Sequence, residues 1–232
     1  MCGRYSLVKS EEEICKRYNL KQTVAFQPRY NVAPGQFMPV ITNSNPGELS
    51  IFRWGLVPNW ADAENIGLNQ FNAKVETILT KAQFKQNVKT NRCLVVADGF
   101  YEWKRVGKNK VPYRITMTSD KIFAMAGIWD SWENKKGEIL NTFAIITTSA
   151  NEAAREIYER MPVILNEESS KLWISQDLSE QELGKLLLPS PSKEISYYKS
   201  HRAINNASLD DPDCIKPAPA LYPGETYSLF DF

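Results

Sequence analysis

Residues 92–118 have the sequence RCLVVADGFYEWKRVGKNKVPYRITMT, and this stretch decides the fold class. Arg92–Ala97 is an apolar run of strand length, which predicts a buried strand. Phe100–Val106 and Pro112–Thr118 flank the turn at Gly107-Lys108-Asn109-Lys110, a pattern typical of a β-hairpin. Neighbouring strands joined by short turns, without a helix between them, predict antiparallel pairing.

Shorter elements are predicted on both sides of this hairpin. Further strands are expected at Met38–Thr42, Leu49–Trp54, Ile122–Trp129, Thr142–Thr147 and Glu194–Ser200. Helices are expected from the Ser10–Glu13 capping box to Leu20, and at Thr77–Val88, Asn151–Tyr158, Glu167–Ser175 and Ser179–Leu188. This order predicts an α+β fold: a single domain over residues 1–232, with a curved, barrel-like, mainly antiparallel sheet and short flanking helices. A Pro-rich tail from about residue 210 is expected to be coil.

Composition and charge restrict the possible partners. The 232 residues are 43% hydrophobic and 24% charged, which is ordinary globular usage. Lys and Arg number 28 against 27 Asp and Glu, so any anionic partner must be bound by a local basic patch. The sequence has no apolar run of membrane-spanning length, and we expect no signal peptide because Met1–Tyr5 does not begin an apolar segment. These features predict a cytoplasmic protein that has no membrane partner.

Cysteine and histidine usage argues against metal and disulfide chemistry. Cys2, Cys15, Cys93 and Cys214 are far apart in the sequence and form no C-x-x-C motif. His201 is the single histidine, which excludes a multi-histidine metal site. We therefore expect no metal and no cofactor, and free thiols in a reducing compartment.

Cys2 has a chemistry that no other position offers, provided that Met1 is removed. The new N-terminal residue then carries an amine and a thiol on adjacent carbons. An amine forms a Schiff base with an aldehyde, and the thiol can close on that imine to give a five-membered thiazolidine. The alternative is that Cys2 is incidental or simply packed in the core.

Other candidates each have a functional and a structural interpretation. Glu102 lies between aromatic residues, where apolar neighbours would raise its pKa and suit it to proton transfer, or it lies in solvent at a strand edge. Asn72 and Lys74 precede a predicted helix and could contact a substrate oxygen and a phosphate, or they only start that helix, with Thr77 as its cap.

The segment Arg53–Trp60 contains two of the six tryptophans, Trp54 and Trp60. Aromatic side chains on a rigid loop can stack on bases, although most tryptophans anchor a core. Arg160 follows a predicted helix and could bind a phosphate or form a surface pair with a glutamate.

Six sequence blocks in this order resemble the SRAP (SOS-response-associated peptidase) family of abasic-site processing proteins. The blocks are Met1–Tyr5, Arg29–Pro34, Arg53–Pro58, Asn72–Thr77, Asp98–Trp103 and Arg160–Pro162. The resemblance spans nearly the whole chain. With this resemblance we expect a monomer that is associated with the nucleoid if the protein is bacterial. The resemblance implies covalent, lyase-like capture of abasic sites in single-stranded DNA, with Cys2 forming a thiazolidine after Met1 is removed by an aminopeptidase or by the protein itself.

The resemblance also implies roles for individual residues. The family's site asparagine and glutamate fall on Asn72 and Glu102, and its arginines fall on Arg4 and Arg160. The expected mechanism places Arg4, Lys74 and Arg160 on phosphates, and Trp54 and Trp103 in the space of the missing base. The chain departs from the family pattern at two positions: Lys74 replaces an arginine, and Tyr158 replaces a histidine that would donate protons more readily.

Two other functions remain open from the sequence. The first is a cysteine peptidase with Cys2 as nucleophile, for which His201 is the one available histidine. The second is a non-catalytic single-stranded DNA-binding module that uses stacking and phosphate contacts.

Overall fold

The computed structural model describes residues 2–119, 121–175 and 178–219. Its centre is a closed barrel formed, in order, by β10 (Ile139–Ser149), β4 (Ser50–Trp54), β3 (Phe37–Thr42), β6 (Arg92–Ala97) and β9 (Phe123–Glu133). The barrel closes because β9 pairs with β6 on one side and with β10 on the other. All of these pairs are antiparallel except β10 with β4, which is parallel.

Three short strands extend the barrel sheet near its rim. β5 (Asn72–Lys74) pairs in parallel with β10, and β11 (Arg160–Pro162) pairs antiparallel with the same strand. β12 (Ile164–Leu165) continues the chain from β11 and pairs with β9. Consequently β5 and β11, which are far apart in sequence, both pair with the last part of β10.

A second, antiparallel sheet lies beside the barrel. Its order is β13 (Ile195–Lys199), β8 (Asn109–Met117), β7 (Gly99–Val106), β1 (Arg4–Leu7) and β2 (Arg29–Val32). Asp98 connects the two sheets, since β6 ends at the residue before it and β7 begins at the residue after it. The predicted hairpin is confirmed with a tighter turn than expected, and Gly107 adopts a positive φ of 59° there. The expected α+β fold with a curved, mainly antiparallel, barrel-like sheet is confirmed.

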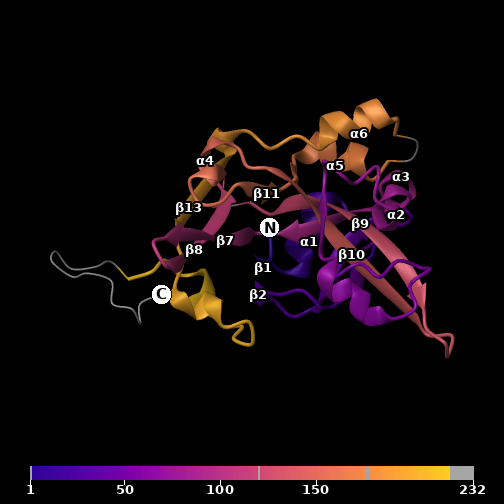
Figure 1. The fold of residues 1–232 in the computed structure, drawn as a ribbon, viewed down its shortest axis with the longest axis horizontal. Coiled ribbons are helices and arrows are strands. Elements are labelled where there is room, and N and C mark those ends of the chain that lie inside the picture. The colour runs from indigo at the N-terminus through magenta and orange to yellow at the C-terminus, as the bar shows by residue number, and fades with distance from the viewer. Residues whose placement is uncertain (1, 120, 176–177, 220–232) are drawn as a thin grey trace.

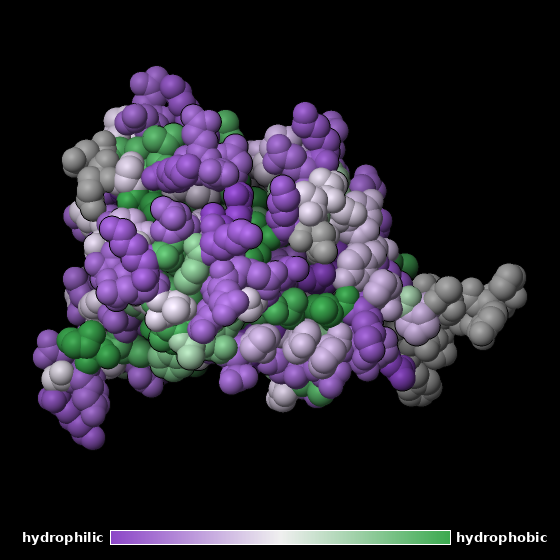
Figure 2. All heavy atoms as spheres, turned by 180° about the vertical axis from the view of Figure 1, so that it is seen from behind, coloured by the Kyte–Doolittle hydropathy of each residue, from purple (hydrophilic) through white to green (hydrophobic). Residues whose placement is uncertain are grey.

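Short helices surround the barrel. The predicted N-terminal helix is α1 (Glu11–Tyr18), with the Ser10–Glu13 capping box formed. α5 (Glu167–Trp173) and α6 (Glu180–Leu186) also confirm predictions and lie toward one end of the molecule in Figure 1, with β8 and β13 toward the other. α4 (Glu152–Arg155) is shorter than expected. Figure 2 shows that the surface seen from behind is mostly hydrophilic, with an apolar strip across it.

The single helix predicted at Thr77–Val88 is wrong. The chain instead forms turns followed by α2 (Ala82–Lys85) and α3 (Asn87–Thr90). Ile78 and Phe84 are both buried. Six residues at about 100° each would place them on different faces of one helix. Breaking the helix lets both side chains reach the core.

The coil predicted from about residue 210 is also only partly correct. Pro212–Ile215 forms a turn of 3-10 helix, and Pro217 makes an isolated β-bridge with Ser200. Residues 220–232 of that tail lie outside the described residues.

Buried Asp98 holds the start of the chain against the second sheet. Its carboxylate accepts hydrogen bonds from the Ser6 hydroxyl at 2.6 Å and the Val8 backbone N–H at 2.5 Å, and it pairs with Arg114 at 2.8 Å. Asp98 and the Arg114 side chain are 4% and 9% exposed, so the pair is shielded from solvent.

We expect Asp98→Ala to lower the free energy of unfolding by about 3 kcal/mol, because it leaves the Arg114 charge buried without its carboxylate. Urea unfolding measures this effect, with the exposed Asp62→Ala as control, for which a change within about 0.5 kcal/mol is expected. Equal midpoints for the two variants would contradict the assignment.

Candidate functional site

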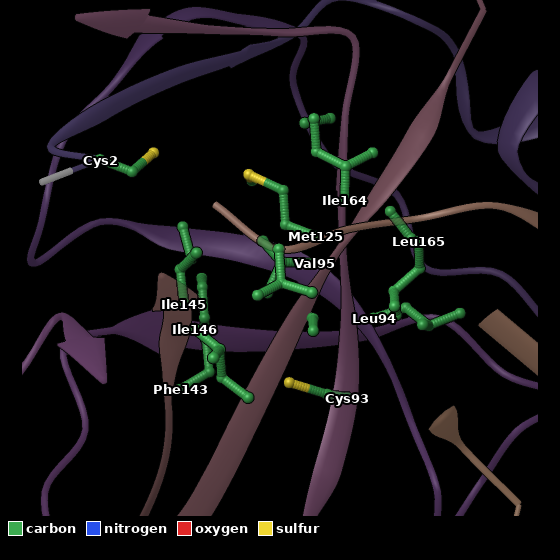
Figure 3. Close-up of a cluster of buried hydrophobic side chains, with 14 of the residues drawn as sticks. Cys2, Cys93, Leu94, Val95, Met125, Phe143, Ile145, Ile146, Ile164 and Leu165 are labelled. Carbon is green, nitrogen blue, oxygen red and sulfur yellow. The ribbon is translucent and has the colours of Figure 1, made fainter. Parts of the chain in front are cut away.

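Cys2 lies just before β1, at the point where the second sheet meets the barrel. β1 pairs with β7 through Arg4 opposite Tyr101 and Tyr5 opposite Phe100, so Cys2 lies two residues before the paired segment. Figure 3 shows its sulfur directed toward a cluster of buried apolar side chains. The side chain is fully buried in the chain that retains Met1. The structural alternative of a packed cysteine therefore describes this form of the chain.

Asn72 contacts the backbone of Cys2. Its side-chain Nδ2 donates a hydrogen bond of 2.8 Å to the Cys2 carbonyl oxygen, and β5 supplies this amide from across the barrel rim. Its Oδ1 is buried and makes no hydrogen bond within the described part of the chain. Asn72 thus positions Cys2 through its Nδ2 atom, and its Oδ1 atom is a further hydrogen-bond acceptor beside Cys2.

Glu102 on β7 is 4% exposed, and its charge acts on Cys2. Burial raises the pKa of Glu102 to about 7, and the positive charge of the N-terminal amine opposes part of this rise. Burial also raises the pKa of the Cys2 thiol well above its usual range, and the negative charge of Glu102 adds to this. The site therefore holds a protonated thiol beside a carboxyl group that exchanges its proton near neutral pH.

Tyr158 shares an open cleft with Glu102. The cleft has a volume of about 640 Å³ and is lined by Glu102, Trp103, Arg105, Lys110, Arg155, Ile157, Tyr158 and Glu159. Tyr158 follows α4 and precedes β11. Burial, followed by the negative charges of Glu102 and Glu159, raises the pKa of Tyr158 above its ordinary value. At neutral pH its phenol is a hydrogen-bond donor and acceptor but a poor acid.

Arg4 and Trp103 form a pair at the same end of the sheet. The Arg4 guanidinium lies 6.0 Å from the centroid of the Trp103 ring. Arg4 Nη1 donates to Asn31 Oδ1 and to the Ile204 carbonyl oxygen, both at 3.0 Å. Trp103 Nε1 donates to Asn205 Oδ1 at 2.8 Å. Both predicted DNA-contacting side chains are thus held in place by the C-terminal part of the chain.

Lys74 and Arg160 flank the end of β10 differently. Lys74 is exposed on β5. Arg160 forms an ion pair with Glu76 and donates a 2.7 Å hydrogen bond to the Thr147 carbonyl oxygen. The hydrogen bond from Arg160 is the main cause that lowers the pKa of Glu76. In the structure Arg160 therefore forms the ion pair with a glutamate that was one of its two interpretations. A phosphate could bind the Arg160 guanidinium only by displacing the Glu76 carboxylate from it.

The prediction that Trp54 contacts DNA is wrong. Trp54 is fully buried, stacks on Phe143 with a centroid distance of 6.4 Å, and packs edge-on against Tyr5. Its Nε1 donates to the Phe71 carbonyl oxygen at 2.8 Å. A side chain without exposed surface cannot stack on a base. Trp60 in the same segment is 63% exposed.

Sequence reasoning missed three cations of the cleft: Arg105, Lys110 and Arg155. A signal for two of them was present, because residues 104–110 contain four basic residues and no acidic one. Arg155 gave no comparable signal, since only the fold brings α4 opposite the hairpin.

Two features can be stated for the described residues alone. No group of three or more His, Cys, Asp or Glu side chains could hold a metal ion there. No helix in this part of the chain has the length and apolar character needed to cross a membrane.

The fold and the site together define a small barrel protein in which the charge of buried Glu102 acts on Cys2, and Glu102 lines a cleft that also contains three cations. The model of the SOS response associated peptidase (SRAP) family matches residues 1–207, and the chain belongs to this family. The predicted family membership is thereby confirmed.

Several relatives are similar along most of their length. The abasic site processing protein YoqW of Bacillus subtilis is 36% identical over 222 residues, which cover 93% of this chain and 99% of YoqW. The abasic site processing protein HMCES of Gallus gallus is 32% identical, covering 86% of this chain and 69% of that protein. A crystal structure of a Bacteroides thetaiotaomicron protein matches with a TM-score of 0.87 and 31% identity, covering 94% of this chain and 100% of that one.

Proposed function

We propose that this protein acts on abasic sites in single-stranded DNA and captures them covalently through Cys2 after Met1 is removed. The observation that carries the proposal is the meeting of Cys2, Asn72 and Glu102 beside a cleft with three cations. The names of the relatives YoqW and HMCES support an abasic-site role. The proposed location is the compartment that holds the DNA, and a monomeric state stays a prediction.

The chemistry balances without a cofactor. The Cys2 amine attacks C1′ of the ring-opened deoxyribose and displaces its carbonyl oxygen as water, which gives an imine. The Cys2 S–H then adds across the C=N bond, so that sulfur joins carbon and the proton goes to nitrogen. The products are a thiazolidine and one water molecule. Glu102 accepts the proton released from the attacking amine and returns it to the departing oxygen.

Burial of the thiol is compatible with this sequence of steps. The second step consumes a neutral S–H group, so a thiol whose pKa is raised still carries the proton that the imine nitrogen needs. Removal of Met1 makes Cys2 the terminal residue, and the hydrogen bond from Asn72 holds the Cys2 carbonyl while the amine reacts.

Incubation with a single-stranded oligonucleotide that bears one abasic site tests the proposal. Denaturing gels and intact mass should show a heat-stable adduct whose mass is the sum of the two reactants less one water molecule. An intact oligonucleotide and a chain with a blocked N-terminus are the controls. Absence of an adduct from the processed chain would refute covalent capture.

The same experiment separates the two alternatives. Turnover of added peptides that depends on Cys2 would instead support a peptidase. Tight binding to abasic DNA by the processed chain, without any adduct, would support a non-catalytic DNA-binding module.

Tyr158 should make proton transfer in this site slower than a histidine would. We expect Tyr158→His to speed formation and release of the adduct by about 10², the lower end of the usual effect of a placed acid or base. Time courses on denaturing gels measure both rates. Tyr197→His on β13, which changes an exposed tyrosine elsewhere, is the matched control. Unchanged rates in both directions would show that Tyr158 takes no part in proton transfer.

A further inference from the structure

The hairpin of β7 and β8 places two positively charged side chains opposite each other, which is unfavourable for strand pairing. Arg105 lies directly opposite Lys110 in the strand register, and both side chains are exposed. Like charges at directly opposed positions destabilise a strand pair. Lys104 and Lys108 are on the same hairpin, and residues 104–110 include no acidic residue. This repulsion would be relieved by an anion bound beside the hairpin.

The hairpin cations extend the site from Trp103. Arg105 is two residues beyond Trp103 on β7, so the two side chains leave the strand on the same face, about 6.6 Å apart. Both residues line the cleft that contains Glu102 and Tyr158. In the described chain, β1 begins at Arg4 opposite Tyr101, so the later residues of β7 have only β8 as a strand partner. Since Arg105 and Lys110 both line the cleft, the cleft reaches this part of the hairpin.

Arg155 supplies a cation from α4 to the same cleft. Its Nη2 donates to the Ala150 carbonyl oxygen at 3.1 Å, which restricts the position of the guanidinium. Among the described residues, no ion pair is formed by Arg105, Lys110 or Arg155. Glu159 is the acidic residue that lines the cleft besides Glu102, and it is exposed. Three cations thus face one exposed carboxylate and one buried carboxyl group.

We propose that Arg105, Lys110 and Arg155 form a phosphate-binding subsite, which holds the DNA strand next to the lesion and directs it along the β7–β8 hairpin. This inference rests on the proposed function, because it takes the sugar of the lesion to lie at Cys2. Arginine offers paired N–H donors that match a phosphate, and lysine adds a point charge.

The salt dependence of binding tests the subsite. The probe is a single-stranded oligonucleotide with one tetrahydrofuran abasic analogue, which has no aldehyde and cannot form the adduct. For Arg105→Ala/Lys110→Ala/Arg155→Ala we expect the slope of log affinity against log salt to fall by about 2, from about 0.7 for each of three lost phosphate contacts. The control Lys16→Ala/Lys135→Ala/Lys136→Ala removes as many exposed cations elsewhere and should keep the wild-type slope.

A neutral backbone substitution locates the contact. A methylphosphonate placed one to three nucleotides from the analogue should weaken binding to the wild-type protein at one of these positions. The same substitution should have no effect on the triple variant, because the charges it would meet are already absent. Thermal unfolding should show that the triple variant is folded and at least as stable as the wild type, since the repulsion between positions 105 and 110 is gone.

The outcomes separate this subsite from the proposed function. If the wild type forms the adduct with abasic DNA but the triple variant keeps the wild-type slope, the subsite is overturned and the proposed function stands. If the wild type forms no adduct, the proposed function fails, and a reduced slope then identifies only a general single-strand contact, which overturns the subsite as stated.

Discussion

Cys2→Ala should abolish the heat-stable adduct with abasic single-stranded DNA completely. The variant keeps an N-terminal amine once Met1 is removed, so it can still form an imine with the sugar aldehyde. It has no sulfur on the adjacent carbon, so the ring cannot close and the imine hydrolyses. A denaturing gel after heating measures the loss, and affinity for the tetrahydrofuran analogue should stay near the wild-type value.

Reduction with borohydride distinguishes this explanation from a general loss of the site. The reducing agent converts an imine to a stable amine, so the adduct of Cys2→Ala should reappear when it is present. Cys15→Ala is the control because it removes a half-buried thiol from α1 and leaves the N-terminus unchanged. A heat-stable adduct of Cys2→Ala without reduction would contradict ring closure by the Cys2 sulfur.

Glu102→Gln should slow adduct formation by about 10² to 10⁴, the usual contribution of a placed acid or base. The amide keeps the shape of the side chain but cannot accept a proton from the attacking amine. Initial rates at saturating DNA measure the effect. Glu168→Gln on α5 removes an exposed carboxylate elsewhere and should leave the rate unchanged.

The pH dependence of the rate of adduct formation should also differ between the wild type and Glu102→Gln. Since burial raises the pKa of Glu102 to about 7, its carboxylate should be lost as pH falls through 7, and the wild-type rate should fall with it. The Gln variant should lack this step. A wild-type rate that is constant between pH 6 and 8, two values chosen about one unit on either side of that pKa, would contradict a role as base.

The rate should fall as pH falls, whereas the contribution of Glu102 to the free energy of unfolding should fall as pH rises. The folded state keeps the Glu102 proton to a higher pH than the unfolded chain, whose glutamate titrates at about 4.5. The contribution of the protonated carboxyl is therefore fully present below pH 4.5 and is lost as pH rises through about 7. Glu102→Gln should remove this decline in the free energy of unfolding.

Particular residues show how far sequence reasoning reached in the site. The resemblance to the SRAP family indicates Cys2, Asn72 and Glu102 as site residues, whereas the local pattern leaves each of them open. In the structure, interactions link the three residues. Trp54 was assigned wrongly because a tryptophan beside glycine and proline has the same sequence pattern whether it faces solvent or the core. Its burial follows from packing against Phe143, which is far away in the sequence. The Arg160–Glu76 pair likewise depends on β5 and β11 flanking one strand.

The local sequence pattern was sufficient to predict the antiparallel hairpin, the capped first helix, the α+β class and the aminothiol that Cys2 would carry. Turn chemistry, helix capping and bond connectivity all act between near neighbours in the chain, so a short segment contains the information they need. Tertiary structure alone decided three other features: the closure of β9 onto β10, the choice between a buried and a solvent-exposed Glu102, and the meeting of Arg155 with Arg105 and Lys110 at one cleft. Burial, electric field and cleft shape are sums over atoms contributed by distant segments, and no single segment contains that information.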